Sequence, residues 1–110
     1  MSEQPPYQLA TQLSRFAYGL AAELLSSDIS AAEKLLLKQF KSETNDVRLD
    51  IRDYEFADTR KEQVAAARRV QRRVVQVRQT VIALSTYNIF TPIDVAQVSA
   101  QLEYLSEQVQ

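Results

Sequence analysis

A cluster of arginine residues in the second half of the chain is the clearest candidate for chemistry. Between residues 59 and 79 there are seven basic side chains and one acid, Glu62, which gives the segment a net charge of +6. Guanidinium groups pair with phosphate and carboxylate oxygens in a bidentate geometry, so the cluster is a candidate site for phosphate or for an acidic partner. The arginines of this cluster that we consider as site residues are Arg68, Arg69, Arg72, Arg73 and Arg78.

An acidic segment directly before the cluster offers a structural explanation for it. Residues 42–58 carry six acids against two arginines, and the chain after Arg78 adds three acids and no basic residue. We therefore expect ion pairs within the chain or between subunits, and rank an acidic protein partner second. Nucleic acid ranks third, because the net charge of −1 repels polyanions and no aromatic side chain lies among the arginines to stack on bases.

Three aspartates form a second candidate site. On a helix, Asp46, Asp50 and Asp53 lie one turn apart on one face, and carboxylates on facing helices can hold a hard cation such as Mg²⁺. Here one helix supplies all three, and Arg48 and Arg52 are interleaved with them. We therefore expect a solvated, ion-paired face and no metal site, with a carboxylate-metal enzyme as a remote third class of function.

The composition excludes most kinds of active site. The chain has 110 residues, of which 45% are hydrophobic and 25% charged, and this is typical of one globular domain spanning residues 1–110. It has no histidine and no cysteine, which excludes zinc fingers, iron–sulfur clusters, thiol nucleophiles and disulfides. The single glycine excludes glycine-rich phosphate loops. We expect no catalytic residue, no cofactor and no enzymatic activity.

Residue patterns also predict the conformation of the N-terminus and the cellular compartment. Pro5 and Pro6 favour extended backbone before them, so residues 1–5 are expected to be disordered. The first residues show no basic region followed by an apolar run, and no uninterrupted apolar stretch is long enough for a membrane span. A cytoplasmic protein is therefore expected.

Apolar spacing predicts two helices in the first half of the chain. Residues 6–25 carry leucine and phenylalanine at spacings of three and four, which is one face of an amphipathic helix. Ser30 and Glu33 form a capping-box pattern, so a second helix should begin at Ala31. The apolar face of the first helix consists of Leu9, Leu13, Phe16, Leu20 and Leu24.

Residues 46–53 are compatible with either a strand or a helix. Val47, Leu49 and Ile51 alternate with charged residues, as in a half-buried strand. Read as a helix, Val47, Ile51 and Tyr54 share one face and continue the second helix. A lone strand would have no partner in this chain, so we favour the helix.

The third helix has the most regular pattern. We expect it to run from about Thr59 to Tyr87 with Asp58 as its N-cap. Its heptad seam, typical of coiled coils, consists of Ala67, Val70, Val74, Val77, Val81 and Leu84. A second apolar stripe off this seam is the candidate oligomer interface and consists of Val64, Val75 and Ile82. On the same heptad, Arg68, Arg69 and Arg72 fall on the outer face.

The last helix should begin at Pro92 with Thr91 as its N-cap and Asp94 in its first turn. Its apolar face consists of Val95, Val98, Leu102, Leu105 and Val109.

These elements predict an all-α, four-helix bundle-like protein with a long central antiparallel hairpin flanked by two shorter helices. The long hairpin has apolar surface in excess of what the short helices cover, which favours a homo-oligomer. We expect a non-enzymatic helical protein–protein interaction module, an adaptor, assembly factor or regulator, whose partners are itself and another protein. The alternative is a nucleic-acid-binding accessory protein that uses the arginine-rich face of the third helix.

Overall fold

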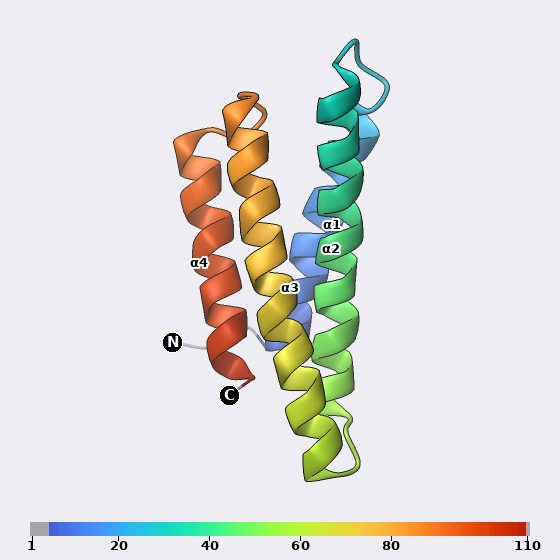
Figure 1. Cartoon of the computed structure of the whole chain (residues 1–110), viewed down its shortest axis with the longest axis vertical. Coiled ribbons are helices and arrows are strands. Elements are labelled where there is room, and N and C mark those ends of the chain that lie inside the picture. The colour runs from blue at the N-terminus through green and yellow to red at the C-terminus, as the bar shows by residue number, and fades with distance from the viewer. Residues whose placement is uncertain (1–4, 110) are drawn as a thin grey trace.

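The computed structural model describes residues 5–109 and confirms the predicted all-α bundle. Its elements are α1 (Pro6–Leu24), α2 (Ala31–Glu55), α3 (Arg60–Thr86) and α4 (Pro92–Gln108). Each helix packs against the next one along the chain, and α4 closes the bundle against α1. Figure 1 shows α2 and α3 as the long central hairpin, with the shorter α1 and α4 beside it.

Side-chain caps start the helices near the predicted positions. The Ser30 hydroxyl accepts from the backbone N–H of Glu33, whose carboxylate accepts from the N–H of Ser30, both at 3.1 Å. Thr91 and Asp94 form the same reciprocal pair at the start of α4, at 3.0 and 3.1 Å. Both predicted N-termini are confirmed. The expectation of disorder at the N-terminus falls mainly on residues 1–4, which lie outside the described range.

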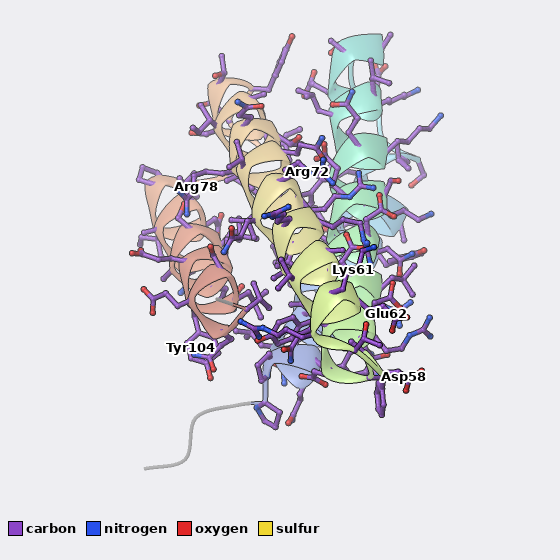
Figure 2. All side chains as sticks on the ribbon, turned by 60° about the horizontal axis from the view of Figure 1, so that its bottom comes forward. Asp58, Lys61, Glu62, Arg72, Arg78 and Tyr104 are labelled. Carbon is purple, nitrogen blue, oxygen red and sulfur yellow. The ribbon has the colours of Figure 1, made fainter. Side chains whose placement is uncertain are left out.

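The start of α3 differs from the prediction by one residue. Thr59, not Asp58, is the N-cap, and its hydroxyl accepts from the backbone N–H of Glu62 at 3.1 Å. Asp58 instead donates its backbone N–H to the Glu62 carboxylate at 3.1 Å (Figure 2). Aspartate and threonine are both good caps, and the turn geometry after α2 decides between them.

The strand reading of residues 46–53 is wrong, because α2 runs without interruption through them. Phe40, Val47 and Ile51 are fully buried on one side of this helix. A helix places all three against the bundle, whereas a strand would leave their backbone groups without partners.

The core runs along the inner sides of all four helices. Five of the six residues predicted for the α3 seam are buried, from Val70 to Leu84. At its first position Ala67 is half-buried and packs against this core, and the neighbouring Ala66 is more deeply buried.

Aromatic side chains pack where the turn between α3 and α4 meets the bundle. Phe90 stacks on Phe16 at 6.0 Å between ring centroids and meets Phe40 edge-on at 5.4 Å. Asn88, with φ of 62°, ends α3 in the left-handed conformation that asparagine tolerates. The backbone N–H of Ile89 then donates to the carbonyl of Leu84 at 3.1 Å, which directs the chain back toward the core.

The helices that the structure describes contain no segment that combines the length and the apolar character needed to cross a membrane.

Candidate functional site

Packing of α3 on α2 divides the arginine cluster into two groups. Arg69 and Arg73 face α2 and reach the aspartates that the sequence singled out. The Arg69 Nε lies 3.2 Å from Asp50 Oδ1, and its Nη2 lies 3.5 Å from Asp53 Oδ2. The Arg73 Nε lies 3.5 Å from Asp50 Oδ2, and its Nη1 lies 3.6 Å from Asp46 Oδ2. The predicted ion pairing between the acidic and basic segments is confirmed for these two arginines.

Asp50 is the centre of this network. Its side chain is 12% exposed and contacts both arginines. Its Oδ2 atom is buried and accepts no hydrogen bond within the described chain, so the Arg73 guanidinium is its main electrostatic compensation. The three aspartates thus form an ion-paired face, as expected, but the prediction that this face is solvated is wrong for Asp50, which is buried. Within residues 5–109, no group of three or more acidic side chains is arranged to hold a metal ion.

A second polar contact extends the α2–α3 interface away from the arginines. The Thr80 hydroxyl donates to Glu43 Oε1 at 2.6 Å. Burial is the main cause that raises the pKa of Glu43 above its ordinary value of 4.5, and the nearby charge of Asp46 adds to it. The hydrogen bond from Thr80 and the charge of Arg73 act in the opposite direction. The sequence did not predict this hydrogen bond, because Thr80 lies outside the apolar seam and its spacing from other residues indicates no contact.

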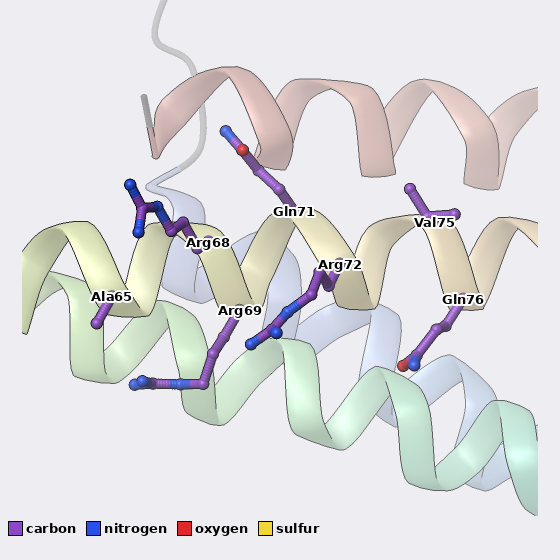
Figure 3. Close-up of a pocket in the computed structure, with 7 residues that line it drawn as sticks. All are labelled: Ala65, Arg68, Arg69, Gln71, Arg72, Val75 and Gln76. Atoms are coloured by element: carbon purple, nitrogen blue, oxygen red, sulfur yellow. The ribbon is translucent and has the colours of Figure 1, made fainter.

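The other three arginines of the cluster remain exposed. Within residues 5–109, Arg68, Arg72 and Arg78 make no ion pair or hydrogen bond with another side chain. The placement of Arg69 on the outer face is wrong, because the helix turns that side chain toward α2. Of that predicted trio, Arg68 extends on the α4 side of α3, whereas Arg72 extends on the α2 side beside Arg69 without an ion pair to the acids of α2 (Figure 3).

A surface depression lies along α3 beside these exposed arginines. In Figure 3, Arg68 and Val75 extend on the α4 side of α3, whereas Arg69 and Gln76 extend on the α2 side. The depression therefore combines guanidinium groups with apolar surface. Its lining consists of Ala65, Arg68, Arg69, Gln71, Arg72, Val75 and Gln76.

The candidate oligomer interface is exposed over most of its length. Val75 is 53% exposed and Ile82 is 57% exposed, so neither α1 nor α4 covers them. Val64, nearer the start of α3, is half-buried. The two exposed side chains are seven residues apart and lie on the same side of α3, together with Arg68 and Arg72 within the adjoining turns.

Comparison with known proteins finds no matching family model, no similar curated protein and no similar solved structure.

Proposed function

We propose that this chain is a non-enzymatic helical protein–protein interaction module that works as a small homo-oligomer through the exposed side of α3. Such a module would serve as an adaptor, an assembly factor or a regulator. It would also bind another protein. The observation that carries the proposal is the exposure of Val75 and Ile82 on one side of a helix whose other sides are packed.

Burial of these side chains is the driving force. A fully exposed aliphatic side chain gains about 1.5–3 kcal/mol when it is removed from water, and Val75 and Ile82, which are already partly buried, would gain a part of this. Because α3 is held against its neighbours along most of its length, no ordering of the backbone opposes association. The exposed arginines beside the apolar side chains would form the polar rim that such interfaces have.

Light scattering of the purified protein over micromolar concentrations tests self-association. We expect the mass to rise above that of one chain, and the double variant Val75→Ser with Ile82→Ser to remain monomeric. The matched control is Leu35→Ser with Phe56→Ser, which removes apolar side chains that are at least as exposed from α2 and the turn after it. A wild-type protein that stays monomeric over the whole range would contradict the proposal.

The second candidate function is nucleic-acid binding by Arg68, Arg72 and Arg78. It is favoured by one observation, namely that these guanidinium groups have no acidic partner within residues 5–109. Retention on DNA or RNA at low salt, with a slope of log affinity against log salt that falls by about one unit for each arginine changed to glutamine, would support it. Affinity that is negligible and unchanged in the triple variant would exclude it.

A cytoplasmic location is part of the proposal. Imaging of the tagged protein in its own cells would check it.

A further inference from the structure

Two exposed stripes, one on α3 and one on α4, carry complementary side chains. The α3 stripe has arginine at one end and aliphatic residues at the other: Arg68, Arg72, Val75, Gln79 and Ile82. The α4 stripe has apolar residues at one end and glutamate at the other: Ile93, Ala96, Ala100, Glu103 and Glu107. All ten residues are exposed in the single chain. Their spacings of three and four keep each set on one side of its helix.

The two stripes match when the helices run in opposite directions. Ile82 lies ten residues from Arg72 and fourteen from Arg68, and Ile93 lies ten residues from Glu103 and fourteen from Glu107. At the rise of an α-helix these separations are about 15 and 21 Å on both helices. One antiparallel alignment therefore brings each arginine to a glutamate and the aliphatic ends to each other.

The glutamates of α4 lack compensation within their own chain. Glu107 lies in the last turn of α4, where the negative end of the helix dipole disfavours an acid, and this turn has no basic residue. Neither Glu103 nor Glu107 makes an ion pair within residues 5–109. An arginine from another chain would offset both the charge of the glutamates and the negative end of the helix dipole.

We propose that the surface which covers the α3 stripe is the α4 stripe of a second copy of this chain, packed antiparallel, with Arg72 opposite Glu103, Arg68 opposite Glu107 and Ile82 opposite Ile93. This inference rests on the self-association proposed above and names the partner surface. Ala96 and Ala100 are small, so the two helices can approach closely where Gln79 and Val75 meet them.

The arrangement of α3 and α4 within one chain allows the contact to occur twice. The two helices are neighbours and run in opposite directions (Figure 1). A two-fold axis along the bundle therefore places α3 of each copy against α4 of the other, antiparallel in both cases. Such a contact closes as a dimer instead of extending into a fibre.

Charge reversal on either stripe tests the pairing. The first variant carries Arg68→Glu with Arg72→Glu, and the second carries Glu103→Arg with Glu107→Arg. Each variant alone should place like charges opposite each other and raise the dissociation constant of self-association at least tenfold. Mixing the two variants in equal amounts should restore association, because each interface then joins an arginine stripe to a glutamate stripe.

The matched control is Arg15→Glu with Lys38→Glu, on exposed positions of α1 and α2. It makes the same change in net charge as the first variant, so it shows the effect of general repulsion, and it should associate nearly as the wild type does. The second variant removes an acid from the end of α4 and should be folded by circular dichroism.

Sedimentation equilibrium of all samples separates the outcomes. A monomeric wild type would overturn the self-association and this pairing together. A wild-type dimer that tolerates both charge reversals as it tolerates the control would overturn the pairing alone. Loss of association in both variants without recovery on mixing would mean that the arginines and glutamates meet other surfaces, and it would likewise overturn the pairing.

Discussion

At the scale of single residues, the position of a charge on its helix decides what it does. Arg69 and Arg72 are three residues apart, yet Arg69 contacts two aspartates of α2 and Arg72 contacts none within residues 5–109. Ion pairs at partly exposed positions are worth about 0.2–1 kcal/mol, so each pair contributes modestly to stability. Arg68 and Arg78, like Arg72, are exposed.

Replacement of Asp50 should be the most destabilising change in the network. Asp50→Ala removes the contacts of both Arg69 and Arg73, and we expect the free energy of unfolding to fall by about 1–2 kcal/mol. Arg68→Gln should change it by less than about 0.5 kcal/mol, because that side chain is exposed and unpaired. Urea unfolding of both variants checks the difference. Equal losses would show that the α2–α3 ion pairs do not contribute.

Glu43 should make stability depend on pH in a defined direction. Burial raises its pKa in the folded state, so the folded protein binds a proton at Glu43 more readily than the unfolded chain does. The stabilising contribution is present below the unfolded pKa and is lost as the pH rises through the folded value. The variant Glu43→Gln does not titrate at this position. Its free energy of unfolding relative to that of the wild type should therefore be higher at about pH 7 than at about pH 4. Urea unfolding at both pH values measures this gain, and a constant difference would contradict it.

At the scale of elements, capping side chains determine where the helices begin. Ser30 and Thr91 each accept from an N–H that the helix itself leaves unpaired, and Thr59 does the same for α3. The N-terminal bounds therefore depend on local chemistry, whereas the burial of each face depends on its neighbours.

The cap of α3 can be tested by two neighbouring substitutions. Thr59→Ala should cost about 1 kcal/mol, because it removes the hydroxyl that accepts from Glu62. Asp58→Ala should cost less than about 0.5 kcal/mol, because only the backbone N–H of Asp58 takes part in the cap. Thermal unfolding of the two variants compares them, and a larger loss for Asp58→Ala would contradict the assignment.

The contribution of α4 to the core can be tested at Leu102. This side chain is fully buried, and Leu102→Ala should cost about 2–4 kcal/mol because it leaves a cavity. Gln97→Ala, on an exposed position of the same helix, is the control and should be close to neutral. Denaturant unfolding gives both values. If removal of residues 91–110 left the melting temperature unchanged, α4 would not complete the core.

At the scale of the whole molecule, the unequal helix lengths leave surface uncovered. The bundle extends 47 × 30 × 19 Å, and its long α2–α3 hairpin is flanked by helices that are shorter by several residues. Val75 and Ile82 are exposed for a different reason, because they lie on the outer side of α3, away from its buried seam. Removal of such surface from water would be favourable.

If the chain self-associates, its thermal stability should depend on concentration. Binding that is specific to the folded state raises the melting temperature as the protein concentration increases. We expect this rise for the wild type and none for the double variant Val75→Ser with Ile82→Ser, whose side chains are exposed in the single chain. Scanning calorimetry over a hundredfold range of concentration checks it. The same concentration dependence in both proteins would argue against this interface.

The sequence by itself determined the helical class, the order and approximate bounds of the helices and the apolar stripe of each one. Spacings of three and four place residues at known angles around one helix, and capping motifs act within a few residues, so both signals are local. Only the tertiary structure decided between Asp58 and Thr59 as cap, between Ala66 and Ala67 in the core, and which arginines are paired. These outcomes depend on the direction in which α2 and α4 approach α3, and spacing along one helix carries no information about that direction.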